Sequence, residues 1–327
     1  MKKVYVIGTG GTISSAGREG STTNYTNGVF DVAALIGGVP GIKDLADIRS
    51  EQIINVSSED MTVKDMLAVA RRIDELASDD SVSGFVVTHG TNTMEETAFF
   101  LDLAVSTEKP IVITGSMRPA TAAGADGAMN LYESVALAAH PSAAGRGVMA
   151  VMGDRIFDAA FLHKSNAFRV DAFTGGDAGC IGYMQDDVPF FLQRSELPHT
   201  ARSGFSAGGL TGLPKVETVL FYVDADPRIL TAAAEGADGL VLAGAGGGFA
   251  GRAWEPVLKE TAGKIPVIRA SRTMDGVVTR DDYDTRVGTV PGYALDPLKA
   301  RILLSFALTK TRDHGAIEDI FKKYSGL

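Results

Sequence analysis

The sequence has 327 residues, of which 45% are hydrophobic and 22% are charged, and its formal net charge is -9. This composition is typical of a folded globular protein, and the length suits about two domains. An acidic chain does not attract a phosphate backbone, so we expect no nucleic-acid partner. Cys180 is the only cysteine, which excludes an intrachain disulfide and a thiolate metal cluster.

No apolar stretch approaches the roughly 18 residues that a membrane-spanning helix needs, so we expect no contact with a membrane. The first apolar run, residues 3–7, is also too short for the core of a signal peptide. We therefore expect a cytoplasmic protein. The five histidines are scattered and none has the spacing of a zinc site, so we expect no metal and no cofactor.

Short apolar runs alternate along the chain with segments of helical periodicity. The strands are expected at residues 3–7, 84–88, 110–114, 147–152, 218–222, 239–243 and 265–269. The helices are expected at residues 63–77, 94–105, 127–139, 252–261, 297–311 and 315–324. Alternation of this kind predicts an α/β fold whose sheet is mostly parallel and flanked by helices. Two helix starts have a local cause: Thr93 and Glu96 have the spacing of a capping box, and Asp296 precedes a proline.

Two stretches have no periodicity. Residues 14–28 are rich in Ser, Thr, Gly and Asn, which is typical of a mobile lid. Residues 193–213 mix Pro, Gly and Ser, which suits an interdomain linker. We therefore expect an N-terminal domain at 1–192 and a smaller C-terminal α/β domain at 214–327.

The first strand runs into the sequence Gly-Thr-Gly-Gly-Thr-Ile, residues 8–13. In open parallel sheets ligands bind beyond the carboxyl ends of the strands, and glycines let the backbone approach a substrate. Thr9 and Thr12 supply hydroxyl groups at that place. A dinucleotide-binding loop would need a glycine at position 13, which is Ile13. A turn with only a structural role is an equal alternative on this pattern alone.

A second polar segment, His-Gly-Thr-Asn-Thr at 89–93, follows another apolar strand. Thr91 is therefore expected on the same rim of the sheet as Thr12. His89 has two interpretations, a general base or a packed and hydrogen-bonded residue, and we favour the second. Residues 55–61 form a third polar cluster, whose serines and acids either bind a ligand or cap a helix. Arg118, after the strand at 110–114, binds a carboxylate or pairs structurally.

Two other motif matches have little support. Residues 204–208 fit the Gly-x-Ser-x-Gly pattern of serine hydrolases but lie in the expected linker, without the strand and helix that this motif needs. Residues 246–251 fit the dinucleotide pattern, yet Arg269 and Arg272 occupy the zone of the acidic ribose partner. An arginine there suits NADP, so a dinucleotide site stays a minor alternative.

Taken together, the polar segments resemble the bacterial L-asparaginase family, which includes glutaminase-asparaginases. The matching residues appear in family order as Thr-Gly-Gly-Thr-Ile (9–13), Asn-Tyr (24–25), Ser-Ser-Glu-Asp-Met (57–61), His-Gly-Thr (89–91), Met-Glu-Glu-Thr (94–97), Ser-Met-Arg-Pro (116–119), Ala-Asp-Gly (125–127), Asn-Leu-Tyr (130–132), Lys164, Arg-Ala-Ser-Arg (269–272) and Leu-Asp-Pro-Leu-Lys-Ala-Arg (295–301). The resemblance covers essentially the whole chain. It implies a larger N-terminal and a smaller C-terminal α/β domain. It also implies a homotetramer of intimate dimers, in which each active site borrows residues from the neighbour's C-terminal domain.

The resemblance also implies roles for four catalytic residues. Thr12 resembles the nucleophile, and Tyr25, on the lid, resembles its activating neighbour. Thr91 and Lys164 resemble a second pair of hydroxyl and amine beside the scissile amide. A threonine hydroxyl needs a nearby base at neutral pH, and Tyr or Lys can serve when its pKa is shifted towards neutrality. The product would be an acyl-enzyme that releases ammonia and is then hydrolysed by water.

The substrate contacts follow in the same way. Ser58 and Glu59 resemble the groups that hold the α-carboxylate and α-amino ends of a small-molecule amide. The backbone around Ser116 resembles the place where the side-chain amide docks. Gly11 and Gly90 lie beside the two threonines, and backbone N–H groups of such a turn can stabilise the oxyanion of a tetrahedral intermediate.

The chain departs from the family pattern at four positions. Asn92 stands where most members have Asp, which removes a carboxylate expected to pair the lysine and to hold the substrate ammonium. Glu59 replaces a Gln found in many asparaginases, accompanies broader glutamine use, and could restore one negative charge. Gly247 stands at a frequent Asn. Tyr283 aligns, within a residue or two, with a glutamate that the neighbour lends.

Three hypotheses therefore stay open. The first is hydrolysis of L-asparagine, with or without glutamine. The second is hydrolysis of another small amide or lactam that lacks the usual α-amino group. The third is a non-catalytic, asparaginase-like binding protein, against which the presence of Thr12, Tyr25, Thr91 and Lys164 argues.

Overall fold

The computed structural model describes residues 1–26 and 28–327, which divide into two compact units. The first unit comprises Met1–Ser195 with His199–Thr211, and the second comprises Glu196–Pro198 with Gly212–Leu327. Each unit has its own sheet with helices packed on it, which confirms the expected larger and smaller α/β domains. Residue 27, in the segment expected to form a lid, lies outside the described residues.

The first unit is built on an eight-stranded sheet in the order β12-β11-β8-β7-β6-β5-β1-β4. Its strands are β1 (Lys3–Gly10), β4 (Asp47–Val56), β5 (Val82–Thr88), β6 (Ile111–Thr114), β7 (Val148–Met152), β8 (Arg155–Asp158), β11 (Gly182–Gln185) and β12 (Val188–Phe191). Neighbouring strands among β4, β1, β5, β6 and β7 pair in parallel. The strands β8, β11 and β12 are added to β7 by antiparallel pairing. The sheet is therefore mostly parallel, as the alternation of strands and helices predicts.

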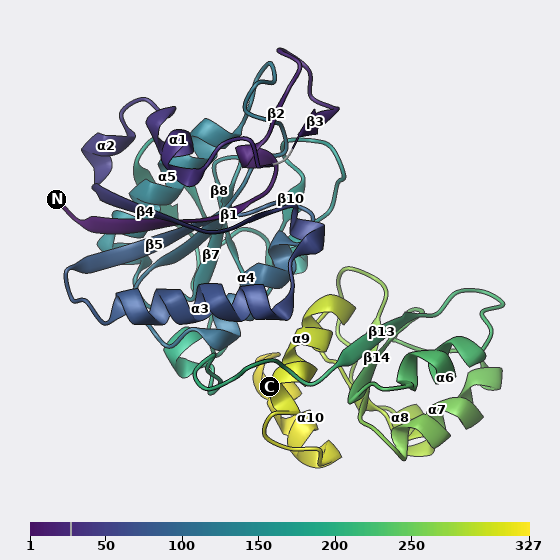
Figure 1. Ribbon diagram of the computed structural model, residues 1–327. Helices are drawn as coiled ribbons and strands as arrows, with labels where there is room; N and C mark the ends of the chain where they lie inside the picture. Colours follow the sequence, from purple (N-terminus) through teal and green to yellow (C-terminus); the bar gives the residue numbers. More distant parts are fainter. Residues whose placement is uncertain (27) are drawn as a thin grey trace. The chain divides into compact units, whose positions relative to one another are not determined.

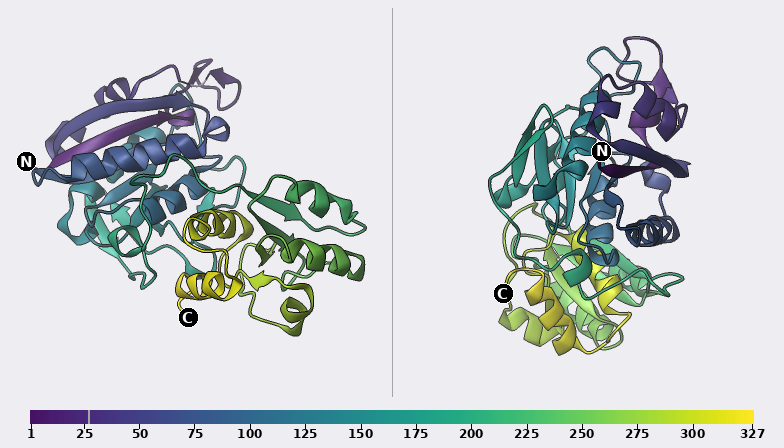
Figure 2. Two further views of the ribbon diagram at one scale, coloured as in Figure 1. Left: turned by 60° about the horizontal axis from the view of Figure 1, so that its bottom comes forward. Right: turned by 90° about the vertical axis from the view of Figure 1, so that its left-hand side faces the viewer.

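Helices cover both faces of this sheet (Figures 1 and 2). The helices α3 (Val63–Ala77) and α4 (Met94–Ala104) lie on one face. On the other face lie α1 (Val32–Gly37), α2 (Ile42–Leu45) and α5 (Gly127–Ala139). Buried side chains of α5 pack there against apolar residues of β1, β5 and β6. Each fully buried aliphatic side chain of such a core contributes about 1.5–3 kcal/mol.

The elements that the sequence pattern does not reveal are mostly short or at an edge. The edge strand β4 carries charged and polar side chains on its exposed positions, which blunts an open edge and also hides the strand from periodicity. The remaining short strands of this unit are β2 (Ala16–Gly17), β3 (Tyr25–Thr26), β9 (His163–Lys164) and β10 (Phe173–Thr174). The hairpin of β2 and β3 gives part of the expected lid a local structure.

The helix starts correct one expectation and confirm another. Thr93 precedes α4 but its side chain makes no cap hydrogen bond, so the predicted capping box is wrong. Its hydroxyl instead donates to the carbonyl of Ser58, 2.7 Å away. The capping box of this unit lies at Thr62 and Asp65, at the start of α3. The cap at Asp296 is present as expected, because its carboxylate accepts two N–H groups of the next turn.

The second unit has a four-stranded parallel sheet in the order β13-β14-β15-β16. Its strands are β13 (Val216–Leu220), β14 (Gly239–Gly244), β15 (Val267–Ser271) and β16 (Val290–Pro291). Its helices are α6 (Arg228–Ala234), α7 (Glu255–Ala262), α8 (Asp282–Val287), α9 (Pro297–Ala307) and α10 (His314–Lys323). The helix expected at 252–261 opens as a 3₁₀ turn, η6 (Arg252–Trp254), and the helix expected to reach residue 311 ends at 307.

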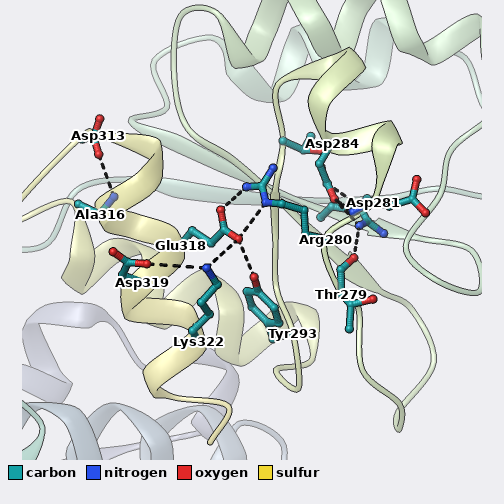
Figure 3. Close-up of polar contacts among 12 residues, drawn as sticks. Thr279, Arg280, Asp281, Asp284, Tyr293, Asp313, Ala316, Glu318, Asp319 and Lys322 are labelled. Carbon is teal, nitrogen blue, oxygen red and sulfur yellow. Dashed lines mark hydrogen bonds and ion pairs between the residues drawn. The ribbon is translucent and has the colours of Figure 1, made fainter. Parts of the chain in front are cut away.

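A buried ion pair joins β15 to α8 in the second unit, and a polar cluster joins α10 to residues outside the helices. The guanidinium of Arg269 binds the carboxylate of Asp284, and both side chains are almost fully buried. Glu318 on α10 accepts hydrogen bonds from Tyr293 and Arg280 and pairs with Lys322 (Figure 3). No helix among the described residues is long and apolar enough to cross a membrane.

Candidate active site

The first wall of the site is the turn after β1. Gly11 has a φ of 86°, and a side chain there would meet the Cα atom of Gly90 at 2.2 Å. Only glycine satisfies both constraints, because L side chains avoid this region of φ and no space is left for a Cβ atom. The next residue, Thr12, opens the 3₁₀ turn η1 (Thr12–Ser14). Its Oγ1 lies 3.2 Å from the hydroxyl of Tyr25 on β3.

The second wall is the segment after β5, which meets the segment after β4. The backbone N–H of Asn92 donates a hydrogen bond to Oγ of Ser58 at a distance of 3.2 Å. Together with the bond from Thr93 to the carbonyl of Ser58, this contact fixes the 3₁₀ turn η2 (Ser58–Asp60) beside the loop at 90–93. Ser58 is therefore not a helix cap, and it joins two loops of the same rim.

A network of four side chains follows from this arrangement. The ammonium group of Lys164, on β9, donates to Oγ1 of Thr91 at 2.9 Å and to Oδ1 of Asn92 at 2.7 Å. The amide nitrogen of Asn92 donates to a carboxylate oxygen of Glu59 at 3.2 Å. The Asn92 amide thus links Lys164 to Glu59. Only one orientation of the amide points its oxygen at the lysine and its nitrogen at the carboxylate.

These segments enclose one small cavity. Its lining consists of Gly11, Thr12, Tyr25, Ser57, Ser58, Glu59, Gly90, Thr91 and Asn92. Lys164 lines a neighbouring hollow that shares Asn92. Thr12 and Thr91, 79 positions apart in the sequence, therefore face the same cavity because the parallel strands that precede them end at one rim.

The electrostatics of the site concern its lysine and its histidine. Burial lowers the pKa of Lys164 below its usual value, and the negative charges of Glu95 and Glu59 partly offset this effect. A lowered pKa makes the neutral amine more accessible, which a proton acceptor requires. His89 is fully buried, bonds to Gly90 and Thr97, and has its pKa lowered to about 4 by burial. It is a packed residue, as favoured from the sequence.

Ser116 is not among the residues that line the cavity. Its side chain is fully buried and its hydroxyl donates to the carbonyl of Arg118 at 2.7 Å. The carboxylate of Asp126 accepts the N–H groups of Met117 and Arg118, and the amide of Asn130 donates to the carbonyl of Gly115. The loop is therefore held rigidly, and Ser116 contributes to an adjoining, mostly apolar hollow under α1 and α5.

Tyr283 belongs to the second unit, where its side chain is buried rather than exposed to solvent. Its ring is 4% exposed and meets the ring of Phe249 edge to face, with 5.4 Å between the centroids. Of the nearby acids, Asp281 caps α8 and Asp284 is buried against Arg269, whereas Asp282 is exposed. Gly247, the other departure in this unit, presents its carbonyl to the guanidinium of Arg269.

Sequence reasoning assigned no role to one residue beside the site. Glu95 accepts the backbone N–H of Lys164 at 3.0 Å. It occurs in the Met-Glu-Glu-Thr motif that carries the family resemblance, but nothing in the spacing ties it to a residue 69 positions later. Among the described residues, no group of three or more His, Cys, Asp or Glu side chains is arranged to hold a metal ion.

Comparisons with known proteins agree with this geometry. The family described as "Asparaginase, N-terminal" matches residues 3–196, and the "Glutaminase/Asparaginase C-terminal domain" matches residues 215–321. L-asparaginase 2 of Bacillus subtilis is 41% identical over 99% of this chain and 87% of its own length. The glutaminase-asparaginase of Acinetobacter glutaminasificans is 39% identical over 98% of this chain and 99% of its own.

A solved structure is similar to the whole chain as well. The crystal structure of a probable cytoplasmic L-asparaginase from Campylobacter jejuni superposes with a TM-score of 0.96, at 40% identity. The match covers 99% of this chain and 100% of that one. Both domains are matched in order, and the matched region covers 99% of the chain. The chain therefore belongs to the asparaginase family of amidohydrolases.

Proposed function

We propose that this protein hydrolyses the side-chain amide of L-asparagine, and also of glutamine, through an acyl-enzyme formed on Thr12. The observation that carries the proposal is the pair of hydroxyl groups on one cavity, each with its own partner. Thr12 contacts the hydroxyl of Tyr25, and Thr91 contacts the amine of Lys164. The names of the related asparaginases and glutaminase-asparaginases support the same substrates.

The proposed first step is attack of the Thr12 oxygen on the amide carbon. The Tyr25 hydroxyl accepts the proton of Thr12 and passes its own proton to the leaving nitrogen, so the carbon–nitrogen bond breaks and ammonia departs. Backbone N–H groups next to Gly11 and Gly90 stabilise the oxyanion, a contribution of about 3 kcal/mol per donor. In the second step, water oriented by Thr91 and the neutral amine of Lys164 attacks the acyl-enzyme and regenerates Thr12.

The substrate ends have separate partners in this proposal. Ser58 binds the α-carboxylate, and Glu59 binds the α-amino group, since Asn92 carries no charge. The backbone beside Ser116, whose side chain does not line the cavity, receives the side-chain amide. A second candidate is another small amide without an α-amino group, which the neutral Asn92 favours. A panel of asparagine, glutamine, their D-isomers and simple amides, read by ammonia release, separates the two candidates.

Replacement of the nucleophile tests the mechanism. Thr12→Val keeps the shape of the side chain and removes its oxygen, so kcat/KM on asparagine should fall by about 10⁴-fold or more while the fold survives. The control is Thr9→Val, because Thr9 lies near the end of β1, three residues before Thr12, but its hydroxyl is buried against the carbonyl of Thr88 and does not line the cavity. Activity of Thr12→Val within tenfold of the parent would refute the assignment.

We further propose that the protein is a cytoplasmic homotetramer of intimate dimers. The family resemblance supports the tetramer, and the similar Campylobacter jejuni protein, described as a probable cytoplasmic L-asparaginase, supports the location. Light scattering should give four times the chain mass of 34.3 kDa. A monomeric mass for the active enzyme would contradict the assembly.

A further inference from the structure

We propose that Glu95 is a positioning residue for Lys164, whose carboxylate holds the lysine backbone at the site and supplies one of the two negative charges that its ammonium group faces. This inference rests on the proposed function of Lys164 and goes beyond it, because it places the control of the lysine outside the cavity. Glu95 does not line the cavity and is not expected to touch substrate.

The first argument is the short element that carries the lysine. Lys164 belongs to the two-residue strand β9, which pairs, in the part of the chain that the structure describes, with the two residues of β10. So short a strand does not fix a side chain by itself. The carboxylate of Glu95 accepts the N–H of Lys164 at 3.0 Å, in addition to the contacts of β10, and thereby ties β9 to the first turn of α4. The N-terminus of a helix is a favourable place for a carboxylate.

The second argument is the position of α4 itself. The loop that precedes this helix contains Thr91 and Asn92, the two residues that receive the lysine ammonium group. The same helix start therefore holds the lysine through Glu95 and presents its hydrogen-bond partners. A single rigid segment thus sets the distance from the amine to the Thr91 hydroxyl.

The third argument is electrostatic. The charged groups that act on Lys164 are Glu95 on α4 and Glu59 on η2, and Glu95 also contacts His163 on β9. Nδ1 of His163 lies 3.4 Å from the same Glu95 oxygen that accepts the lysine N–H. Both side chains of this pair are mostly buried, at 15% and 14% exposure, so water screens their charges weakly.

The central test is Glu95→Gln, which keeps an oxygen acceptor for the lysine N–H and removes the charge. Loss of a nearby negative charge destabilises the ammonium form, so the pKa of Lys164 should fall. The acid limb of the profile of kcat/KM against pH should move to lower pH by about 0.5–1 unit. The rate on the plateau should stay within about threefold of the parent.

Two further variants separate position from charge. Glu95→Ala also removes the acceptor, so kcat should fall about tenfold or more at every pH. Glu96→Gln removes the adjacent acidic charge in the same helical turn, and its profile should coincide with that of the parent. Thermal unfolding establishes that each variant is folded.

A readout independent of turnover is the NMR titration of the ¹³Cε signal of Lys164 in lysine-labelled protein. A downward pKa shift in Glu95→Gln supports the inference even in a protein that hydrolyses none of the amides tested, which would defeat the proposed function alone. Coinciding titration curves for Glu95→Gln and the parent overturn the inference, as does a Glu95→Ala enzyme with unchanged kcat and pH profile.

Discussion

The family resemblance sets Asn92 at a position where most members have Asp, and both ends of the Asn92 amide form hydrogen bonds. Its oxygen accepts from Lys164 and its nitrogen donates to Glu59. A carboxylate at this position would still bind the lysine, but its second oxygen would face the Glu59 carboxylate. The neutral amide therefore lets Glu59 remain the one acidic group at this end of the cavity without repulsion.

The exchange Asn92→Asp tests this interpretation. A second carboxylate should strengthen binding of the asparagine ammonium, so KM should fall about three- to tenfold. The added negative charge should also raise the pKa of Lys164 and move the acid limb of the rate profile to higher pH. The ligand-free protein should melt at a lower temperature because two carboxylates then face each other.

The matched control adds Glu59→Gln to Asn92→Asp, which removes that repulsion and should restore the melting temperature. Steady-state kinetics from pH 5 to 9 and thermal unfolding measure both effects, over a range that brackets the ordinary pKa of a histidine and approaches that of a lysine. An unchanged KM for asparagine in the single variant would show that the missing carboxylate does not limit substrate binding.

Residue-scale reasoning from the sequence places Thr12 and Thr91 at one rim, and both line the cavity. It does not find the contact between Glu95 and Lys164, because a hydrogen bond between residues far apart depends on how a loop returns to a helix. It also gives Thr93 the wrong partner: the spacing of a capping box is present, but Ser58 offers its carbonyl to the hydroxyl.

At the scale of elements, helix α5 carries a buried acidic side chain midway along its length. Glu133 is 1% exposed, and burial together with the negative charges of Asp154 and Asp186 raises its pKa to about 8. The folded protein therefore holds this proton up to about pH 8, whereas the unfolded chain releases it near the ordinary value of 4.5. Stability from this group is present at low pH and is lost as the pH rises through that window.

Glu133→Gln removes this titration. The variant should be about as stable as the parent at pH 4 and more stable at pH 9, by up to about 4 kcal/mol. Denaturant unfolding of the parent and the variant at both pH values gives the difference. Asp187→Asn, at an exposed position in the turn between β11 and β12, is the control and should leave the pH dependence of stability intact. Equal losses of stability from pH 4 to pH 9 in Glu133→Gln and the parent would exclude a buried, protonated acid.

Glu318 on α10 has the opposite effect on the pH dependence of stability. The guanidinium of Arg280, with the Tyr293 hydroxyl and Lys322, holds the pKa of Glu318 at about 2 (Figure 3). The stabilising contribution is complete above the ordinary pKa of 4.5 and is lost as the pH falls towards 2.

Glu318→Gln should therefore destabilise the second unit by about 2 kcal/mol at pH 7 and by much less at pH 2.5. Calorimetry at the two pH values measures the change. Asp319→Asn is the matched control, since the Asp319 side chain is 80% exposed and its removal should cost little. A Glu318→Gln penalty that is the same at both pH values would contradict the ionic role of Glu318.

Whole helices and strands differ in how well the sequence predicts them. The helices at Val63–Ala77 and Gly127–Ala139 have the expected bounds, because their apolar residues repeat with a helical period and their ends are marked locally. The edge strand β4 and the hairpin of β11 and β12 are absent from the prediction. The strand β4 carries polar side chains at its exposed positions, and β11 and β12 are only four residues long, with a proline in β12.

At the scale of the whole molecule, two α/β units each carry a wholly or mostly parallel sheet, and the residues that line the candidate active site all belong to the first. The boundary between the two units falls within residues 193–213, the stretch expected to be a linker. Residues 199–211 of this stretch pack with the first unit. Because the parallel strands β1 and β5 are neighbours, the loops that follow them meet at the same rim. This topology is what allows distant threonines to share a cavity.

The sequence by itself determines the fold class, the two-domain organisation as an expectation, the family, and the residue types that the chemistry needs. Hydrophobic periodicity and glycine-rich strand ends are local properties of the sequence. They can therefore be recognised without knowing which distant residues meet in the fold. The tertiary structure alone decides that Asn92 joins Lys164 to Glu59, that Glu95 holds the lysine backbone, and that Tyr283 is packed. These contacts depend on the return of loops in three dimensions, where burial and hydrogen-bond geometry select one arrangement among many that the sequence permits.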